Sequence, residues 1–386
     1  MSELSPAAAH LRALIRCPSV TPEEGGALDY LVSVLEPLGF ECHRLRFAEV
    51  DNLYARRGSA APNICFAGHT DVVPPGHEDD WSRPPFEGAI DGADMIGRGA
   101  VDMKGAVASF LAAVEEIGPD HAGSISLLVT GDEEGPAENG TVKVLEWLAG
   151  RDETIDACIL GEPTNPDALG DALKVGRRGS LSGEIVVEGV QGHAAYPHLA
   201  DNPLRALSPM VSSLMHPPFD EGTERFQPTN LEVTSIDTGN SATNVVPARA
   251  RALFNVRFND TWSPETLKEE IVRRVESKAQ DDALRPGRDA IAFRIAWRDR
   301  PSPVFLTKDE SLIAAVSDAV EGELGRRPDL STGGGTSDAR FIKDVAPVVE
   351  FGLVGRTMHQ IDERVALADL DTLARVYARA LRTLLS

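Results

Sequence analysis

The chain has 386 residues, of which 42% are hydrophobic and 5% aromatic, so it is long enough for two domains with separate cores. Its formal net charge of −22 argues against nucleic acid and anionic membranes as partners, although local basic clusters can still bind small anions. The cysteines form no CxxC pair, so we expect free thiols. Neither a signal peptide nor the ~20 apolar residues of a membrane span is evident, so we expect a cytoplasmic protein.

The N-terminal part of the chain predicts two helices followed by strands. A helix begins at Ser5-Pro6, and residues 22–38 carry an apolar stripe at helical spacing. Strand-like segments follow at Phe40–Phe47, Asn52–Arg57 and Asn63–Ala67.

A histidine and an aspartate follow the last of these strands. His69 and Asp71 are two positions apart, so in an extended chain they face the same way. A metal-bound histidine usually donates its second ring nitrogen to a carboxylate or a carbonyl group. Asp71 is therefore placed to orient His69 in a metal site.

Asp102 lies just before a predicted helix, Lys104–Ile117. An aspartate at this position is commonly a helix N-cap. Because a capping carboxylate can also bind a metal ion, both interpretations stay open.

Three consecutive acids follow a predicted buried strand, Ser124–Thr130. Asp132, Glu133 and Glu134 place like charges side by side, which is costly unless a cation lies nearby. A solvated acidic turn is the alternative for such a motif in isolation.

A further strand, Ile155–Leu160, ends just before Glu162, and this repetition favours a shared site. Ligand sites of open α/β sheets lie beyond the carboxyl ends of the strands. We therefore expect His69, Glu162 and the acids after residue 130 to gather there, with Asp102 nearby.

The composition changes after about residue 178, and an inserted α+β unit with the order βαββαβ and an antiparallel sheet is predicted. Its expected elements are the strands Ser180–Val190, Asn230–Ile236, Arg249–Phe258 and Ala290–Trp297 and the helices Pro203–Met215 and Pro264–Lys278. The expected domains are 1–178 with 296–386, and 179–295. In the last part helix and strand alternate again, and His359 lies in a loop before a C-terminal helix from Asp369 to Leu385.

Several stretches together resemble the di-zinc, aminoacylase-like family of deacylases and exopeptidases. The stretches of this chain that are similar to the metal-site motifs of that family are GHTDVVPPG, GRGAVDMKG, TGDEEGP, GEPT and TMHQIDE. Further stretches are similar to motifs of the desuccinylase branch of that family, namely WSRPPF, GRRGSLSG, GVQGHAAYPHLADNP and GGGTSDARF. The resemblance runs along the whole chain and implies a zinc-exopeptidase-like α/β catalytic domain with an inserted dimerisation or lid domain.

The resemblance also implies a site with two divalent metal ions. One ion would be held by His69 and Glu162 and the other by Glu134 and His359, with Asp102 bridging both. Nitrogen and carboxylate ligands suit Zn²⁺, and such a site also accepts Co²⁺ or Mn²⁺.

The resemblance also implies catalytic roles for two acids next to the implied ligands. Glu133 would be the general base that activates water, and Asp71 would be the partner of the histidine ligand. The resemblance further implies a cis peptide bond between Asp102 and Met103.

Substrate contacts are implied for a further set of residues, namely Lys174, Arg177, Ser180, Tyr196, Arg257, Gly335 and Thr336. His193 and Asn244 would reach the neighbouring subunit's site across a homodimer formed by the insert. Guanidinium groups in an acidic protein suit a small-molecule substrate with several carboxylates, although pairing with surface acids is the alternative for any single arginine.

One position departs from the family pattern. The asparagine that many members carry four residues before the last metal-binding histidine is replaced by Gly355 here. A side-chain amide contact to the substrate is therefore lost, while the metal ligands are unaffected.

The expected reaction is hydrolysis of an N-succinyl amide, and the sequence has three alternative interpretations. A deacylase for another N-acyl amino acid, such as acetylornithine, belongs to the same class. A catalytically silent scaffolding relative would lack the base or a ligand, and all of them are present. A Ca²⁺-stabilised structural protein is disfavoured because two histidines are poor Ca²⁺ ligands.

Overall fold

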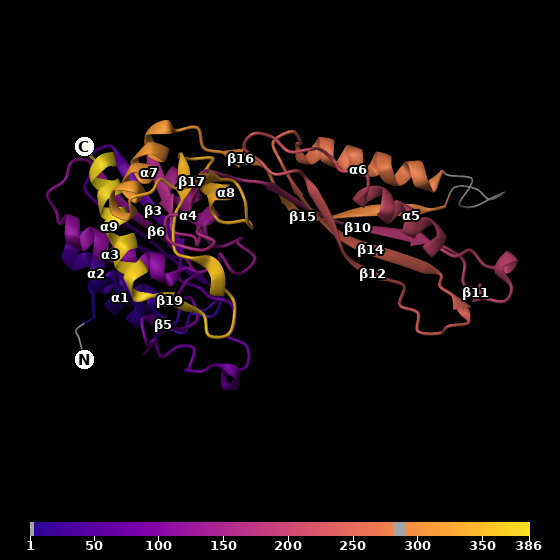
Figure 1. Ribbon diagram of the computed structural model, residues 1–386, viewed down its shortest axis with the longest axis horizontal. Helices are drawn as coiled ribbons and strands as arrows, with labels where there is room; N and C mark the ends of the chain where they lie inside the picture. Colours follow the sequence, from indigo (N-terminus) through magenta and orange to yellow (C-terminus); the bar gives the residue numbers. More distant parts are fainter. Residues whose placement is uncertain (1–3, 281–290) are drawn as a thin grey trace. The chain divides into compact units, whose positions relative to one another are not determined.

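The computed structural model describes residues 4–280 and 291–386, with the backbone alone for residues 299 and 300. The chain forms two compact units (Figure 1). Unit 1 consists of Met1–Val175, Thr307–Ser331 and Ser337–Ser386, and unit 2 of Gly176–Leu306 and Thr332–Thr336. Among the described residues, no helix is both long and apolar enough to cross a membrane.

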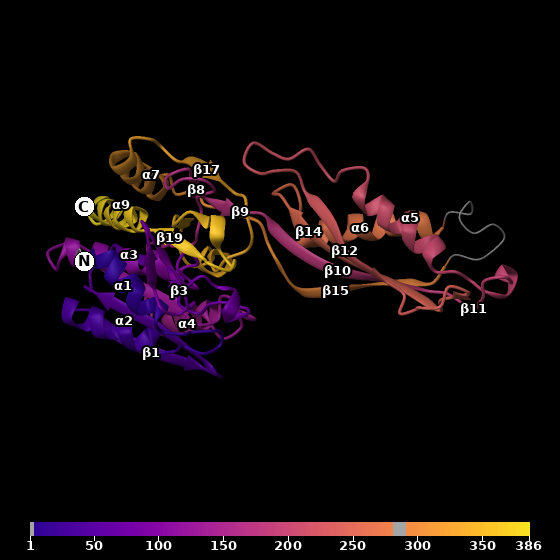
Figure 2. The ribbon, with the colours of Figure 1, turned by 60° about the horizontal axis from the view of Figure 1, so that its bottom comes forward.

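Unit 1 is built on a mixed sheet of eight strands in the order β1-β2-β6-β3-β7-β18-β8-β17, seen from a second direction in Figure 2. The strands are β1 (Glu41–Phe47), β2 (Val50–Arg57), β3 (Asn63–His69), β6 (Ser124–Thr130), β7 (Ala157–Leu160), β8 (Ala172–Lys174), β17 (Asp329–Ser331) and β18 (Val348–Glu350). Strands β6, β3, β7 and β18 run parallel. Every residue of β3, β6 and β7 is buried, as is usual for central parallel strands covered on both faces.

Helices and short elements complete unit 1. They are α1 (Pro6–Ile15), α2 (Ala27–Leu35), α3 (Lys104–Ile117), α4 (Thr141–Ala149), α7 (Glu310–Leu324), α8 (Ala339–Ile342), α9 (Leu367–Leu384), η1 (Glu36–Leu38), η2 (Glu78–Asp80) and η4 (Gly355–Thr357). A small sheet joins β19 (Arg364–Ala366), β5 (Asp94–Ile96) and β4 (Ala89–Asp91). Phe66 of β3 stacks on Phe110 of α3 with ring centroids 4.4 Å apart and meets the edge of Tyr377 of α9 at 5.3 Å. These contacts hold α3 and α9 on the central strands.

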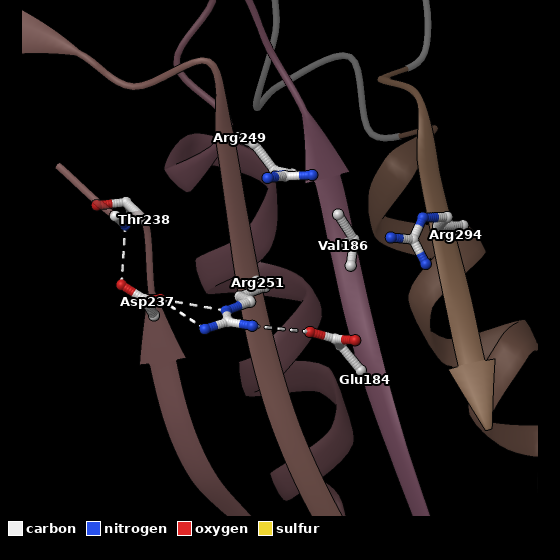
Figure 3. A pocket seen from close by; sticks show the side chains of 8 residues that line it. Glu184, Val186, Asp237, Thr238, Arg249, Arg251 and Arg294 are labelled. Carbon is white, nitrogen blue, oxygen red and sulfur yellow. Dashed lines mark hydrogen bonds and ion pairs between the residues drawn. The ribbon is translucent and has the colours of Figure 1, made fainter. Parts of the chain in front are cut away.

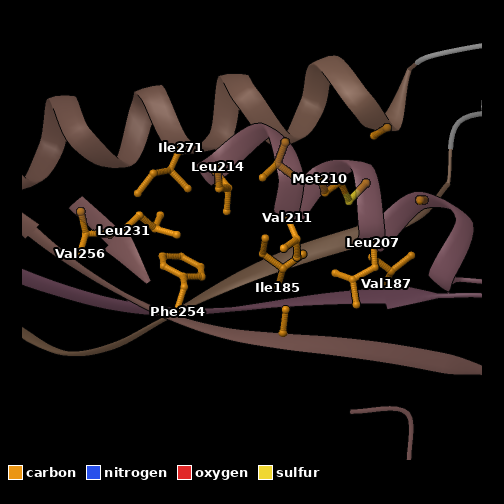
Figure 4. Packing of buried hydrophobic residues seen from close by; sticks show 14 of the residues in the cluster. Ile185, Val187, Leu207, Met210, Val211, Leu214, Leu231, Phe254, Val256 and Ile271 are labelled. Atoms are coloured by element: carbon orange, nitrogen blue, oxygen red, sulfur yellow. The ribbon is translucent and has the colours of Figure 1, made fainter. Parts of the chain in front are cut away.

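Unit 2 is an antiparallel sheet in the order β12-β14-β10-β15. Its elements are β10 (Gly179–Glu188), α5 (Leu204–Met215), β12 (Asn230–Asp237), β14 (Arg249–Phe258), α6 (Pro264–Ala279) and β15 (Phe293–Ser302). Leu214 of α5 and Ile271 of α6 pack against Phe254 of the sheet (Figure 4). The chain order is the predicted βαββαβ, although Ala290, the first residue of the predicted last strand, lies outside the described residues.

Two short strand pairs lie in the connections of unit 2: β9 (Gly176–Arg177) with β16 (Phe305–Leu306), and β11 (Gly192–His193) with β13 (Val245–Val246). The short helix η3 covers Pro197–Leu199. The predicted fold class, an α/β domain with an α+β insert, is confirmed.

Candidate metal centre

The parallel strands of unit 1 bring distant side chains to one edge of the sheet. His69 is the last residue of β3, Glu134 follows β6, and Glu162 follows β7. Because β3 pairs in parallel with both β6 and β7, the carboxyl ends of all three strands meet at the same edge.

The first group of potential ligands surrounds His69, which is fully buried. Its Nε2 atom lies 3.2 Å from Asp102 Oδ1 and 3.9 Å from Glu162 Oε1. Glu133 also belongs to this group, because His69, Glu133 and Glu162 offer ligand atoms within 4.8 Å of one another.

The second group surrounds His359, whose side chain is 48% exposed. Its Nε2 atom lies 2.8 Å from Glu134 Oε1 and 3.3 Å from Asp102 Oδ2. The two carboxylate oxygens of Asp102 therefore face different histidines, which is the arrangement that a bridging ligand requires.

Asp71 contacts this centre in two ways. Its backbone carbonyl oxygen lies 2.8 Å from His69 Nδ1, closer than its carboxylate, whose Oδ1 lies 3.6 Å from the same atom. The carboxylate instead accepts hydrogen bonds from the backbone N–H groups of Glu133 (3.3 Å) and Glu134 (3.1 Å). Asp71 thus orients the histidine through its main chain and the two glutamates through its side chain.

Asp102 does not cap the helix that follows it. The N-cap of α3 is Met103, and no side chain caps this end. The predicted cis peptide bond between Asp102 and Met103 is confirmed. The Met103 side chain fills space beside Gly68 and Gly161, where a Cβ atom on either glycine would collide with it.

Burial and the crowding of charges shift the pKa values of these groups. Burial and the neighbouring Glu162 raise the pKa of Glu133 well above its usual range, and burial raises the pKa of Asp71 to about 6. Hydrogen bonds to Asp102 and Glu134 raise the pKa of His359 to about 10. Burial alone would raise the pKa of Asp102, but the two histidines hold it well below its usual range.

The donor set fits divalent metal ions. Two imidazoles and the carboxylates of Asp102, Glu134 and Glu162 converge, and such nitrogen and oxygen ligands suit Zn²⁺, Co²⁺ or Mn²⁺. The fully buried Lys104 donates its Nζ to the Cys17 carbonyl oxygen (2.8 Å), and in the described part of the chain no ion pair joins it to these carboxylates. A cation at the centre would offset the cost of burying them together.

The predicted substrate residues fall into separate places. Lys174 belongs to β8 in unit 1. In unit 2, Arg177 donates to the Gly335 carbonyl oxygen, and Ser180 pairs with Arg257 across β10 and β14. Thr336 ends the short segment that carries Gly335.

The other predicted substrate residues of unit 2 lie around the β11–β13 pair. The rings of His193 and Tyr196 are 5.6 Å apart, and the Asn244 carbonyl oxygen accepts a hydrogen bond from Ala194 N–H (2.9 Å). Strand β14 separates this group from Arg257, because Arg249 at its start is eight residues from Arg257, or roughly 26 Å at the usual rise of an extended strand.

Three further buried residues lie near the metal centre, of which the sequence indicated Asp132, as part of the acidic run, but neither Arg98 nor Glu363. Asp132, the first of the three acids, accepts from the N–H groups of Glu138 and Asn139, both at 2.9 Å, and so shapes the loop after β6. Arg98 and Glu363 form a buried ion pair of 2.7 Å. The one sequence signal for Glu363 is its place in TMHQIDE, four residues after His359.

A pocket of about 350 Å³ lies on the open face of the unit 2 sheet (Figure 3). Arg251 binds Asp237 there at 2.9 Å and lies 3.7 Å from Glu184. Since both acids of this pocket are engaged with an arginine, it offers neither a general base nor a set of metal ligands.

Comparison with known proteins gives a consistent family and fold. Residues 65–383 match peptidase family M20/M25/M40. An M20 family metallo-carboxypeptidase from Sulfolobus solfataricus is similar in structure, with 18% identity, 99% of both chains covered and a TM-score of 0.77. A tripeptidase from Staphylococcus aureus has 17% identity, 98% coverage of both chains and a TM-score of 0.78. A dinuclear metal-binding M20 peptidase from Bacillus subtilis has 18% identity over 98% of this chain and 97% of its own, with a TM-score of 0.73.

Proposed function

Because the chain belongs to peptidase family M20/M25/M40 and is a metal-dependent hydrolase, we propose that it is a succinyl-diaminopimelate desuccinylase. The reaction is hydrolysis of the amide bond of N-succinyl-LL-2,6-diaminopimelate, which consumes one water molecule and releases succinate and LL-2,6-diaminopimelate. The proposal places the protein in the cytoplasm, in lysine and diaminopimelate biosynthesis.

The observation that carries the proposal is a cluster of guanidinium groups in unit 2. Arg257 pairs with Ser180 across β14 and β10, which places it beside the segment that carries Arg177 and Arg178. Burial, and then the charges of Arg178 and Arg177, lower the pKa of Arg257. Cations are gathered in this way where anions bind, and the proposed substrate carries a succinyl carboxylate and two α-carboxylates. The resemblance of GRRGSLSG and GGGTSDARF to desuccinylases points in the same direction.

The proposed chemistry divides between the metal ions and the side chains. Two bound ions, Zn²⁺ or Co²⁺, held by the ligand set of His69, Asp102, Glu134, Glu162 and His359, would acidify water and polarise the amide carbonyl group. Glu133 accepts a proton from the attacking water at its carboxylate and delivers it to the leaving amine. Asp71 keeps Glu133 in place through the backbone hydrogen bond at 3.3 Å.

We further propose a homodimer formed through the insert. His193 and Asn244 lie at the opposite end of β14 from Arg257, so one unit 2 cannot place both groups on the same small substrate. This separation supports the assignment of His193 and Asn244 to the partner subunit's site.

Steady-state kinetics with three substrates test the proposed specificity. The purified Zn²⁺ or Co²⁺ protein is assayed with N-succinyl-LL-2,6-diaminopimelate, N-acetylornithine and a dipeptide. We expect the succinyl substrate to give the highest kcat/KM. A higher value for acetylornithine favours the alternative deacylase, and a higher value for the dipeptide favours a peptidase.

Arginine variants test the cluster itself. Arg257→Ala and Arg177→Ala should each lower kcat/KM for the succinyl substrate at least tenfold, because a charge-assisted hydrogen bond contributes about 1.5–3 kcal/mol. The metal content should not change. Arg273→Ala is the control, since Arg273 lies on α6, pairs with Glu270 (2.7 Å) and belongs to neither proposed substrate group, and it should leave kcat/KM near the wild-type value. Wild-type kinetics in both test variants would refute the assignment.

A further inference from the structure

A buried ion pair connects the two loops that carry Asp102 and His359. Arg98 Nη1 lies 2.7 Å from Glu363 Oε2, and the side chains are 3% and 0% exposed. Burying two charges is unfavourable unless each is fully hydrogen-bonded, so the contacts of this pair indicate what it holds in place.

Glu363 binds the loop that presents Asp102. Its Oε1 accepts hydrogen bonds from the backbone N–H groups of Val101 (2.8 Å) and of Asp102 itself (3.1 Å). Its Oε2 accepts a further bond from Gly99 N–H (3.0 Å). One carboxylate therefore fixes three backbone groups of residues 99–102, including that of the proposed bridging ligand.

Arg98 binds the loop that presents His359. Its Nη1 donates to the Gln360 carbonyl oxygen (3.1 Å) and its Nη2 to the His359 carbonyl oxygen (3.4 Å). The guanidinium carbon lies 5.2 Å from the centre of the Trp81 ring, which covers it. The ion pair thus joins the backbone of His359 to the backbone of Asp102.

The two groups of metal ligands differ in how their backbones are supported. His69 is paired with Thr130 within the sheet, and Glu162 lies two residues after β7, directly after Gly161, whose N–H group donates to the Ala67 carbonyl oxygen (3.1 Å). His359 lies in a loop with a backbone φ of 62°, a value uncommon outside glycine, and its side chain is 48% exposed. The position of His359 therefore depends on contacts such as those of Arg98.

We propose that the Arg98–Glu363 pair is the positioning element of the metal site formed by Asp102, Glu134 and His359. It keeps the bridging carboxylate and His359 at the separation that the second ion requires, while His69 and Glu162 are placed by the ends of β3 and β7. The proposal rests on the metal centre of the proposed function and not on the acyl group of the substrate, so metal binding tests it independently of the desuccinylase assignment.

A titration of Glu363→Gln with Co²⁺ tests this. Glutamine keeps the shape but replaces one accepting oxygen by an N–H₂ group, which then faces either the backbone N–H groups or Arg98. Metal-free protein is titrated by calorimetry and by visible absorption. We expect the wild type to bind two ions, and the variant to bind the ion held by Glu134 and His359 10–100-fold more weakly, with a smaller loss for the other ion, which shares Asp102 but not His359.

Two controls separate positioning from general stability. Asp220 in unit 2 has a similar structural role, since it accepts hydrogen bonds from Gly222 N–H (2.9 Å) and Thr229 N–H (3.1 Å), so Asp220→Asn should keep both ions. The double variant Arg98→Met/Glu363→Gln removes both buried charges. If the ion pair positions the metal ligands, the double variant still binds the second ion weakly, even when its melting temperature returns to the wild-type value.

Two outcomes would overturn the proposal. One is wild-type affinity for both ions in Glu363→Gln, and the other is equal weakening of both sites. If circular dichroism shows that Glu363→Gln does not fold, Arg98→Lys is titrated instead. This variant keeps the charge but loses the two-pronged contact with the carbonyl groups of residues 359 and 360, and the same loss of metal affinity is expected.

Discussion

At the metal centre, the adjacent residues Glu133 and Glu134 have different surroundings. The Asp71 carboxylate holds the backbone N–H groups of both Glu133 and Glu134. Their side chains then take different directions, because Glu134 Oε1 reaches His359 at 2.8 Å while Glu133 lies with His69 and Glu162. This arrangement agrees with the proposal that Glu134 binds a metal ion and Glu133 carries a proton.

The variant Glu133→Gln should retain its metal ions but lose most of its turnover. An amide cannot accept the proton from water, and general base catalysis typically contributes about 10²–10⁴-fold to the rate. Metal analysis and kcat on the same preparation check this. If the variant loses an ion and the remaining loaded protein still turns over, the roles of Glu133 and Glu134 are the reverse of those proposed.

Metal binding should release protons at neutral pH. In the metal-free protein Asp102 and Glu134 raise the pKa of His359 to about 10, so its imidazole is protonated at pH 7 and must lose that proton to bind an ion. Calorimetry in two buffers of different ionisation enthalpy measures the released protons. We expect fewer in His359→Ala, and heats that do not depend on the buffer would contradict the prediction.

The same group sets a pH dependence of stability in the metal-free protein. The folded-state pKa of His359 lies above the unfolded value of about 6.5, so the protonated imidazole contributes to the free energy of unfolding. This contribution is fully present below pH 6.5. That contribution is lost as the pH rises through about 10. Bound metal should remove this dependence, since the imidazole is then already neutral.

Among the elements, β10 and β14 of unit 2 show how glycines allow aromatic rings to pack. Gly183 pairs with Phe254 and Gly179 pairs with Phe258 in the register of the two strands. A Cβ atom on either glycine would collide with the ring opposite. Each ring thus lies over the glycine of the neighbouring strand and closes the core beneath α5 and α6.

Gly183→Ala should therefore destabilise the insert by roughly 1–3 kcal/mol, the usual effect of overpacking a core. Urea unfolding followed by circular dichroism measures the change, and the metal content should remain that of the wild type. Gly150→Ala serves as a control because a Cβ atom there meets neighbouring atoms only at ordinary distances, 3.6 Å and beyond. Equal stability of the Gly183 variant and the wild type would show that β10 adjusts to the methyl group.

At the scale of the whole molecule, the charge is distributed unevenly. Residues 176–306 carry 16 Lys and Arg against 17 Asp and Glu, so nearly all of the net charge of −22 belongs to the rest of the chain. An acidic surrounding favours the uptake of divalent cations. The nearly neutral insert, with its arginine cluster, is better suited to bind an anionic substrate.

The proposed homodimer leads to a whole-molecule prediction. Sedimentation at micromolar concentration should give twice the chain mass of 41.4 kDa. His193→Ala should lower kcat without dissociating the dimer or changing its metal content, because in the proposed dimer the residue acts on the partner's substrate. A fully active monomer, or unchanged turnover in His193→Ala, would argue against it.

Much of this molecule follows from local sequence pattern. Strand β6, strand β14 and helix α3 have the predicted bounds, because runs of apolar residues with period 2 or 3.6 reflect burial directly. The gathering of His69 and Glu162 was also predictable, since parallel strands bring their carboxyl ends together, and Asp102 was expected nearby.

Other features depend on which distant segments become neighbours, and no local pattern records this. Arg98 and Glu363 are 265 positions apart, and only the folded loops bring them within 2.7 Å. The main-chain role of Asp71 and the location of His193 and Arg257 at opposite ends of β14 are of the same kind. Side-chain type and spacing determine which chemistry a segment can carry, whereas the packing of the segments determines which atoms meet.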